Sequence, residues 1–287
     1  MSRWTGNNLR HIASMFRYGA NPAATVYDSI GEDFFLAIAP GWLNLGLWEG
    51  DGSDPDEGPR AVERLVGELA SHLPGGGDVL DVGNGLGAQD LVIRRVVEPR
   101  RLAAVNITRS QLVAGRERLA EARALAINAD ACGLPVRAGS FDGVISVEAA
   151  FHFGSRLDFF REALRVLRPG GVISLSDVPT IRWPKTPSEY VAAGSQLRVW
   201  GLRRASAASP QEIRSLLIRA GFERVQMQLV GDRVIAPALR SVRESLRRKT
   251  KDVDRTYAAA ASFMVSRVEL LWDHGMVDYA LISARKP

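Results

Sequence analysis

A glycine-rich segment that follows a short apolar run is the first candidate binding site in this sequence. Residues 78–82 read DVLDV and residues 83–87 read GNGLG, so glycines stand where a predicted strand turns into a helix. Glycine lets the backbone approach a ligand closely, and the start of the next helix offers free N–H groups. In open α/β sheets, ligands bind in the crevice at the carboxyl ends of the strands. The segment therefore predicts a ligand site but does not identify the ligand.

The residues around these glycines argue against a dinucleotide. Gly83, Gly85 and Ala88 fit the dinucleotide pattern G-x-G-x-x-A. Asp81, however, precedes the first glycine, where a carboxylate would repel a pyrophosphate but could accept hydrogen bonds from an ammonium group. About 20 residues further on, where that pattern needs an acid for the ribose, the sequence reads VNIT. The segment therefore favours a ligand that carries an ammonium group.

A histidine at the end of another predicted strand is the candidate proton acceptor. Residues 148–153 read EAAFHF, which places His152 at the edge of the sheet where the glycines also lie. Histidine has an ordinary pKa near neutrality and can take a proton from a hydroxyl that acts as a nucleophile. The alternative is a structural histidine that holds the loop. We predict His152 as the catalytic base and Glu148 as a second catalytic candidate that contacts the ligand or orients a neighbour.

The elements that must position these residues alternate along the chain. Apolar runs are interspersed with helical patterns from residue 78 onwards, which is typical of crossover units and a parallel sheet with helices on both faces. The strand candidates are 78–82, 102–107, 124–129, 141–147, 172–178, 223–230 and 277–284. The helical patterns in the core are 91–97, 109–123, 155–168 and 210–220. Residues 179–208 and 234–274 break the rhythm, and we interpret them as additions that cover one end of the sheet.

Composition excludes several classes of protein. The chain has 287 residues, 46% of them hydrophobic and 24% charged, which is enough apolar content for a large core. No apolar run approaches the roughly 20 residues of a membrane span, and the N-terminus lacks the apolar stretch of a signal peptide. The single cysteine, Cys132, rules out an internal disulfide framework. We therefore expect a cytoplasmic protein that binds no membrane.

The charge balance raises the question of a nucleic-acid partner. The chain contains 37 Lys and Arg residues against 32 Asp and Glu residues, a net charge of +5, and nearly all the cations are arginines. The most arginine-rich stretch, residues 239–255, interleaves its cations with Glu244, Asp252 and Asp254. Such interleaving is typical of a solvated helix face rather than of a surface that follows phosphates. We expect no nucleic-acid partner.

An ordered set of motifs resembles a known enzyme family. DVGNGLG, VNITRSQL, NADACGLPV, FDGVISVEAAFHF and LRPGG, in this order, resemble the class I S-adenosylmethionine-dependent methyltransferases. The segment YDSIGEDFFLAIAPGWLNLGLW resembles the one before the core in the small-molecule members, which include tocopherol, sterol and macrolide methyltransferases. The resemblance covers roughly residues 25–230 and resumes at 277–287. It implies S-adenosylmethionine as cofactor and an α/β fold with a Rossmann-like, doubly wound, mostly parallel seven-stranded sheet and helical cap insertions.

The resemblance also divides the chain. It implies an N-terminal helical arm and cap (1–58), a cofactor-binding core (59–178), a cap insertion (179–208), a return to the core (209–230), a helical cap (231–277) and a last core strand (278–287). The helical face formed by Leu9, Ile12, Met15 and Phe16 in the arm must be buried somewhere. It can be buried on the chain's own cap or on a neighbouring subunit, and we predict a homo-oligomer formed through the arm.

Individual cofactor contacts follow from the matched motifs. Gly83, Gly85 and Gly87 would line the methionine part, with Asp81 acting on its ammonium group through water or backbone. Asn106 stands where the family usually has an acid on the ribose, and an amide can both accept from and donate to a diol. Asp130 would accept from the adenine amine. The complete implied set is Tyr27, Trp48, Asp81, Gly83, Asn84, Gly85, Gly87, Asn106, Ile107, Gln111, Asp130, Ala131 and Glu148.

The remaining motifs bear on the substrate. The Asn/Asp-Pro-Pro-aromatic motif of enzymes that methylate the amino groups of bases is absent at 148–153. The cap segments are rich in aromatic residues, which fits an apolar pocket. The predicted substrate contacts are Phe151, Trp183, Tyr190 and Trp200, and the cap also carries Phe263, Met264 and Trp272. No His, Cys, Asp and Glu residues have the spacing of metal ligands, so we expect no metal.

The sequence thus predicts methyl transfer to an apolar small molecule of secondary metabolism. One reaction is O-methylation of a hydroxyl, with His152 as the base. The other is C-methylation of an alkene or prenyl chain, in which His152 or Glu148 removes a proton afterwards or a cyclisation consumes the charge. The alternatives outside this class are an RNA-modifying methyltransferase and a cofactor-binding cyclase that does not methylate.

Overall fold

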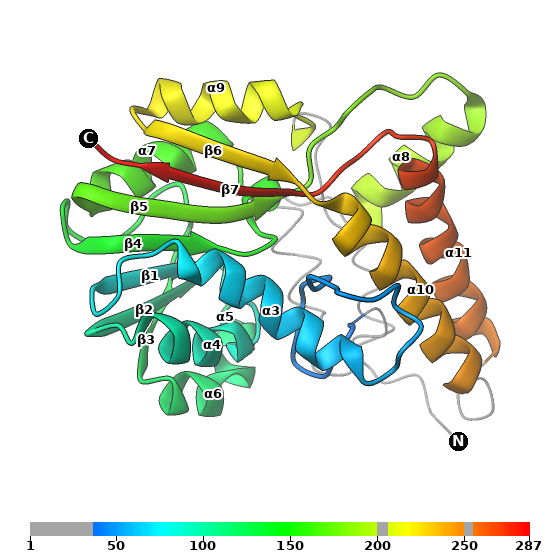
Figure 1. Ribbon diagram of the computed structural model, residues 1–287, viewed down its shortest axis with the longest axis horizontal. Helices are drawn as coiled ribbons and strands as arrows, with labels where there is room; N and C mark the ends of the chain where they lie inside the picture. Colours follow the sequence, from blue (N-terminus) through cyan, green and yellow to red (C-terminus); the bar gives the residue numbers. More distant parts are fainter. Residues whose placement is uncertain (1–36, 200–205, 250–254) are drawn as a thin grey trace.

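The structure is a computed structural model, and it describes residues 37–199, 206–249 and 255–287. Figure 1 shows a twisted sheet with helices on both faces and a separate group of helices beyond one end of the strands. The predicted arm residues and the predicted ligand contacts Tyr27 and Trp200 lie outside the described residues.

One sheet of seven strands, in the order β3-β2-β1-β4-β5-β7-β6, forms the centre of the fold. β1 to β5 run parallel, whereas β7 is antiparallel to both β5 and β6. The strands are Asp78–Val82 (β1), Arg101–Asn106 (β2), Ala124–Asn128 (β3), Phe141–Ser146 (β4), Leu167–Asp177 (β5), Glu223–Leu229 (β6) and Ala280–Arg285 (β7). The strand order reverses between β1 and β4, which is where open α/β sheets bind ligands. The predicted mostly parallel, doubly wound seven-stranded sheet is confirmed.

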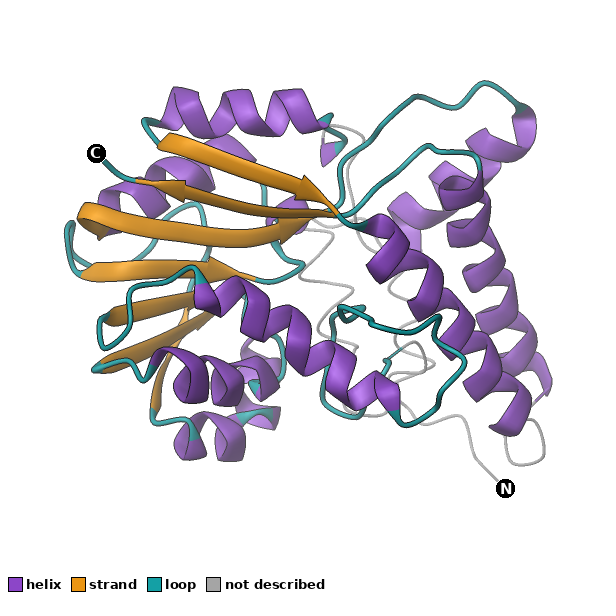
Figure 2. Cartoon of the chain, viewed as in Figure 1, coloured by secondary structure: helices purple, strands orange, loops and turns teal. Residues whose placement is uncertain are grey.

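Helices cover both faces of this sheet (Figure 2). The sheet-covering helices are Glu57–Ser71 (α3), Ala88–Val97 (α4), Arg109–Ala114 (α5), Arg116–Glu121 (α6), Arg156–Val166 (α7) and Pro210–Ala220 (α9). One face packs against α7 and α9, through Phe159, Phe160 and Leu217. The other face packs against α3 and α4, through residues such as Leu65 and Ile93. The longer helices α3, α4, α7 and α9 each bury apolar residues three or four apart, as expected of helices that lie on a sheet.

Three further helices form a cap at the carboxyl end of the parallel strands (Figure 1). They are Pro187–Val199 (α8), Gly231–Lys249 (α10) and Arg255–Asp273 (α11). α11 packs between α10 and α8. We call these three helices the cap. In the described part of the chain, no helix is both long and apolar enough to cross a membrane.

Two predicted elements differ from the observed ones. The helix predicted at 155–168 ends at Val166, and β5 begins at Leu167 and includes the Pro-Gly-Gly segment. The reason is pairing with the chain terminus, because the Gly170 N–H donates to the Lys286 carbonyl and the Lys286 N–H to the Gly171 carbonyl. The helix predicted at 109–123 is split into α5 and α6 at Gly115, where a Cβ would lie 2.5 Å from the Leu86 carbonyl oxygen.

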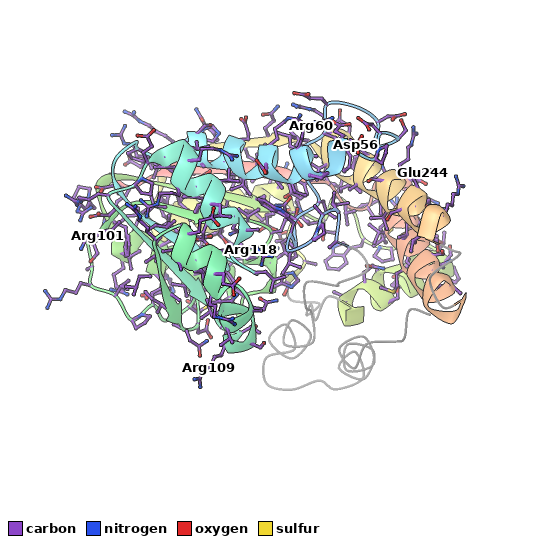
Figure 3. The ribbon with its side chains drawn as sticks, turned by 90° about the horizontal axis from the view of Figure 1, so that it is seen from below. Asp56, Arg60, Arg101, Arg109, Arg118 and Glu244 are labelled. Atoms are coloured by element: carbon purple, nitrogen blue, oxygen red, sulfur yellow. The ribbon has the colours of Figure 1, made fainter. Side chains whose placement is uncertain are left out.

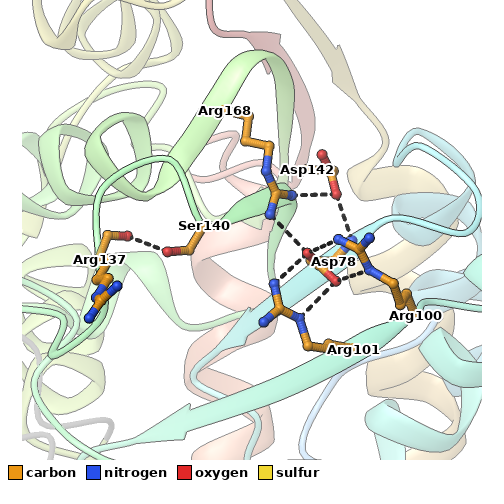
Figure 4. Close-up of polar contacts among 7 residues, drawn as sticks. All are labelled: Asp78, Arg100, Arg101, Arg137, Ser140, Asp142 and Arg168. Carbon is orange, nitrogen blue, oxygen red and sulfur yellow. Dashed lines mark hydrogen bonds and ion pairs between the residues drawn. The ribbon is translucent and has the colours of Figure 1, made fainter.

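Arginines and acids alternate over the surface. In Figure 3, Arg101 and Arg109 project from the sheet half of the molecule, and Asp56, Arg60 and Glu244 lie toward the cap. At the amino end of β1 the buried carboxylate of Asp78 accepts from Arg100, Arg101 and Arg168 (Figure 4). These arginines hold the pKa of Asp78 well below its usual range. The arginines of this end are therefore engaged in ion pairs.

Candidate active site

Two neighbouring cavities lie at the carboxyl end of the parallel strands. The smaller one, the sheet-edge cavity, has a volume of about 90 Å³ and is lined by the ends of β1, β2 and β4 and the loops that follow them. The larger one, the cap chamber, has a volume of about 400 Å³ and lies between this edge and the cap. Leu43, Asn44, Glu148 and His152 line both. The two cavities therefore meet at the predicted catalytic residues.

The glycine loop shapes the floor of the sheet-edge cavity. Gly83 and Gly85 line it, and Gly83 has a φ of 85°, a left-handed conformation that favours glycine. A Cβ at Gly83 would lie only 2.4 Å from the Cβ of Ala149. The Gly83 N–H donates to the Val105 carbonyl at 2.8 Å, which ties the loop to β2. The loop is therefore held in a shape that only glycine permits, with its backbone open to a ligand.

A pair of buried carboxyl groups lies behind this loop. Both oxygens of Asp81 accept from the Gln89 side chain, at 2.8 and 2.7 Å, and Asp90 accepts from Asn84 at 3.0 Å. Burial, reinforced by the charge of Asp90, raises the pKa of Asp81 well above its usual range, and burial raises the pKa of Asp90 to about 7. Asp81 does not itself line the cavity, whereas Gln89 does. Asp81 therefore acts on the cavity through Gln89.

The side of the cavity at the end of β2 is built from amides. The Asn106 side chain donates to Gly85 and Gln111 at 3.2 and 3.0 Å, and its oxygen accepts from the Thr108 N–H at 2.9 Å. Asn106 and Gln111 are buried, and both line the cavity. Asn106 thus connects the glycine loop to the start of α5.

The opposite end of the cavity is shaped by Asp130 and its neighbours. Asp130 is exposed and lines the cavity with Ala131 and Ile107. One carboxylate oxygen of Asp130 accepts from the Cys132 N–H at 2.8 Å, which fixes the side chain and leaves the other oxygen available for an amine. The structure thus brings together most of the predicted cofactor contacts. Those that line the cavity are Gly83, Gly85, Asn106, Ile107, Gln111, Asp130, Ala131 and Glu148.

Other predicted cofactor residues lie elsewhere. Trp48 is 1% exposed and packs against Ala61 and Ala238, so its indole has no surface to offer a ligand. Asn84 is buried against Asp90, and Gly87 precedes α4 with a φ of 82°. None of the three lines the sheet-edge cavity. Trp48 belongs to the core, whereas Asn84 and Gly87 belong to the glycine loop itself.

Glu148 stands at the junction between the two cavities. Its Oε1 accepts from the Leu45 N–H and from the Tyr279 hydroxyl, both at 2.8 Å, and its own N–H donates to Ser176 at 2.9 Å. Burial raises the pKa of Glu148 to about 7. Glu148 has a φ of 49°, a left-handed conformation that is costly for a residue with a side chain. The local backbone is therefore strained where it presents this carboxyl group.

His152 lies on the same side of the junction. It ends the short helical turn Ala150–His152 that follows β4, and its ring lies 4.3 Å from the Phe151 ring, between centroids. Phe153 packs edge-on against Phe159 of α7 at 4.8 Å. The aromatic neighbours hold the turn against the core and leave the His152 ring lining both cavities.

The cap chamber is predominantly apolar. The described substrate contacts predicted from sequence, Phe151, Trp183 and Tyr190, all line it, as does Met264. Trp183 and Tyr190 are 55% and 60% exposed, which places them at its mouth. Phe263 is exposed and does not line the chamber, and Trp272 packs instead against the core cluster that includes Val230 and Val234. The cap supplies much of the remaining lining, for example Leu239, Val242, Val265 and Leu271.

Several site residues were not predicted from the sequence. Tyr279, the residue immediately before β7, donates to Glu148 from a distant part of the chain, and Arg156 of α7 lines the cap chamber while paired with Asp177. Leu43 and Asn44 line both cavities from the segment before α3. The only available signal was position, because Tyr279 lies in the last predicted strand and Arg156 follows His152 by four residues. Within the described ranges, no three His, Cys, Asp or Glu residues gather as metal ligands would.

Comparison with known proteins agrees with this geometry. Residues 80–175 match the methyltransferase domain family. The chain is 28% identical to erythromycin 3''-O-methyltransferase of Saccharopolyspora erythraea over 92% of its own length and 90% of that protein. It is 26% identical to 27-O-demethylrifamycin SV methyltransferase of Amycolatopsis mediterranei, over 85% of this chain and 90% of that one.

Solved structures share the fold. The cyclopropane synthase MmaA2 of Mycobacterium tuberculosis superposes with a TM-score of 0.77 at 17% identity, covering 94% of this chain and 99% of that one. The [4+2]-cyclase SpnF superposes with a TM-score of 0.67 at 21% identity, covering 99% and 96%.

The matched domain and the methyltransferase homologues therefore indicate an S-adenosylmethionine-dependent methyltransferase, with residues 80–175 as its methyltransferase domain. Within that class, the homologues of this chain are natural-product O-methyltransferases. The site fits the cofactor, since the loop closes against Ala149 without a Cβ at Gly83 and Asp130 offers a carboxylate oxygen at the far end. Gly83, Gly85 and Gln111 would hold its methionine and ribose parts.

Proposed function

We propose that this enzyme transfers a methyl group to a hydroxyl of a largely apolar natural product. The observation that supports this most directly is the shared boundary between the two cavities, where His152 and Glu148 line both the sheet-edge cavity and the cap chamber. A nucleophile in the cap chamber would approach the cofactor site at that boundary. Both side chains are then within the region where a proton must leave the attacking group.

The chain's own residues would bind the cofactor, orient the substrate and deprotonate the hydroxyl that is methylated. S-adenosylmethionine, when bound, supplies an electrophilic methyl group. The glycine loop and Gln111 hold the cofactor, and the apolar walls of the cap chamber exclude water and fix the hydroxyl, so that much of the rate comes from orientation. His152 accepts the hydroxyl proton as the oxygen attacks. Glu148, with its pKa near 7, is the second proton acceptor at this boundary.

The substrate class follows from the walls of the chamber. An apolar cavity with a few polar groups favours a molecule with a large hydrocarbon surface and scattered oxygens. The homologues that act on erythromycin and on 27-O-demethylrifamycin SV support a macrocyclic natural product. We further propose that the substrate is a free small molecule, and that no nucleic acid is needed to bind it. The homo-oligomer expected from the N-terminal arm also remains a proposal.

Carbon methylation and cyclisation are the competing reactions. The fold is shared with a cyclopropane synthase and with a [4+2]-cyclase, and a proton acceptor at the cavity boundary would serve carbon methylation equally well. The identity of the attacked atom therefore distinguishes the reactions.

The test is to incubate the full chain with S-adenosylmethionine and a macrolide that carries a free 3''-hydroxyl, and to analyse the product by mass spectrometry and NMR. The proposal predicts one added methyl group, with its carbon bonded to oxygen. A new carbon–carbon bond would support C-methylation, and an isomer of unchanged mass would support a cyclase. Activity that requires RNA and falls steeply with salt would support the RNA-modifying alternative.

A further inference from the structure

Among the residues that the structure describes, Arg156 and Arg182 line the cap chamber, and their hydrogen bonding differs. Arg182 lies at the mouth and donates all five of its N–H groups. The acceptors are both carboxylate oxygens of Glu189, the Trp183 carbonyl and, through two separate bonds, the His274 carbonyl. A guanidinium group has only five N–H groups. Arg182 is therefore fully used in holding the mouth of the chamber together.

Arg156 is buried more deeply than Arg182, and some of its N–H groups have no acceptor among the described residues. Its side chain is 6% exposed, and its Nε and Nη2 atoms donate to the two oxygens of Asp177, each at 2.8 Å. One N–H of Nη1 donates to the Ser206 carbonyl. Three of its five N–H groups thus have acceptors among the described residues, and one N–H on each of Nη1 and Nη2 remains. Buried N–H groups are rarely left without an acceptor, because the loss of hydration is costly.

The charge around Arg156 indicates what kind of acceptor fits. Asp177 is fully buried and forms a bidentate pair with Arg156, so the guanidinium charge is already compensated. Arg182 is compensated by Glu189 in the same way. An anionic ligand would therefore be opposed by Asp177 from behind and by Glu148 in the same chamber when that carboxyl is ionised. A neutral oxygen with lone pairs meets no such opposition.

We propose that Arg156 is the polar anchor of the cap chamber, which donates its two remaining N–H groups to a neutral carbonyl, ester or hydroxyl oxygen of the methyl acceptor. This inference rests on the proposed function in assuming that the chamber receives that acceptor. Arg156 follows His152 by four residues across the turn that leads into α7. An oxygen bound at Arg156 therefore sets the position of the rest of the substrate relative to the proton acceptors, and Arg156 selects which hydroxyl reacts.

The test uses three small probes of one shape, and it does not require turnover. Cyclooctanone, cyclooctane and cyclooctanecarboxylate are titrated into the full chain by NMR, with S-adenosylhomocysteine present to fill the sheet-edge cavity. The measured quantity is the ratio of the cyclooctane Kd to the cyclooctanone Kd. In Arg156→Lys, which keeps the charge opposite Asp177 but loses the forked donors, we expect this ratio to fall about tenfold, as for loss of a hydrogen bond to a charged group.

Two further variants keep the test decisive. The double variant Arg156→Gln, Asp177→Asn removes both charges together, so it leaves no unpaired buried carboxylate if the lysine variant fails to fold, and the same fall is expected. Arg182→Lys is the matched control, and its ratio should stay within about twofold of the wild-type value, because Arg182 has no remaining donor.

An unchanged ratio in the Arg156 variants, or tightest binding of the carboxylate by the wild-type chain, would overturn the inference. The probe titration and the product assay test separate proposals. If the chain selected the ketone but transferred no methyl group, the proposed function would be contradicted and the role of Arg156 would stand.

Discussion

At the scale of single residues, the proposed reaction depends on the two proton acceptors at the cavity boundary. His152 lines both cavities, and its aromatic neighbours fix the turn that presents it. A general base typically contributes about 100-fold to 10,000-fold in rate. His152→Ala should therefore lower kcat at least about 100-fold and leave the S-adenosylhomocysteine Kd within about threefold, as measured by steady-state kinetics and calorimetry. A variant with near-normal kcat would remove His152 from the proton-transfer step.

Glu148 gives a pH prediction of definite sign. Its pKa is about 7 in the folded protein against 4.5 ordinarily, so between these values the folded state keeps a proton that the unfolded state has lost. Its contribution to the free energy of unfolding is complete below about pH 4.5 and is lost as the pH rises through 7. Glu148→Gln stays neutral and can still accept from Leu45 and Tyr279. The stability of this variant relative to wild type should rise by about 3 kcal/mol between pH 4.5 and 7.5.

Urea unfolding at a series of pH values measures this difference. Parallel stability curves for the two proteins would show that Glu148 titrates normally. Asp81 and Asp90 also have raised pKa values, and they are present in both proteins. Their contributions therefore cancel in the comparison.

The sequence predicted single residues well where a local motif fixed them. Gly83, Gly85 and Asp130 each belong to a short pattern that carries its own geometry, and all three line the sheet-edge cavity. Arg156 could not be predicted, because its role depends on Asp177 at the end of a strand 21 residues further on. Trp48 was predicted to contact the cofactor but is buried in the core. The sequence around an aromatic residue does not distinguish a ligand contact from a core position.

At the scale of elements, the glycine loop is the part whose shape is most constrained. Gly83→Ala introduces a side chain at a positive φ and against Ala149, so the loop must move. We expect the S-adenosylhomocysteine Kd to rise at least about tenfold, together with a loss of about 1–3 kcal/mol of stability. Calorimetry and denaturant unfolding measure both quantities.

Gly67→Ala is the matched control for this loop. Gly67 lies inside α3, and a Cβ there meets nothing within 4 Å. Because alanine favours the helix interior more than glycine does, the control should gain up to about 1 kcal/mol of stability and bind S-adenosylhomocysteine normally. If Gly83→Ala bound the ligand as well as this control does, the glycine loop would not be the cofactor site.

Elements were predicted from periodicity where local pattern and tertiary contact agree. α9 begins at a capping box formed by Ser209 and Glu212 and ends at Gly221, as the sequence indicates. The first part of β5 was missed, because Pro169-Gly170-Gly171 normally punctuates a chain. Here Gly170 and Gly171 bond to Lys286 near the other end of the sequence, and that long-range pairing extends the strand.

At the scale of the whole molecule, the two ends of the sheet serve different purposes. The carboxyl end holds the cavities, and the amino end is tied together by Asp78 and its three arginines (Figure 4). The pKa of Asp78 is lowered, so its contribution to stability is present above about pH 4 and is lost as the pH falls further. Asp78→Asn should cost roughly 1.5–3 kcal/mol at pH 7 and leave kcat unchanged.

Acid unfolding provides the check on this prediction. The wild-type stability should fall more steeply below pH 4 than that of Asp78→Asn, so the two curves should converge. If Asp78→Asn were as stable as wild type at pH 7, the ion pairs between Asp78 and its arginines would not stabilise the folded protein. A variant with impaired kcat would mean that the amino end of the sheet is coupled to the site.

The arrangement of the whole molecule was predictable only in outline. An apolar cap over the sheet edge was expected from the helical residues 234–274 and the aromatic residues around Trp183. Which residues line the chamber depends on how α8, α10 and α11 pack, since Met264 faces the chamber whereas Phe263 is exposed outside it. Adjacent residues on one helix point in different directions. A helical sequence pattern does not show which of them faces the chamber until the neighbouring helices are known.

A crystal structure with S-adenosylhomocysteine bound would show directly whether the two cavities together form the active site. We expect the adenine amine at Asp130, the homocysteine over Gly83 and Gly85, and the sulfur atom at the boundary beside Glu148 and His152, facing the cap chamber. A sulfur atom separated from the chamber by protein, or a ligand bound away from the glycine loop, would rule out this active site.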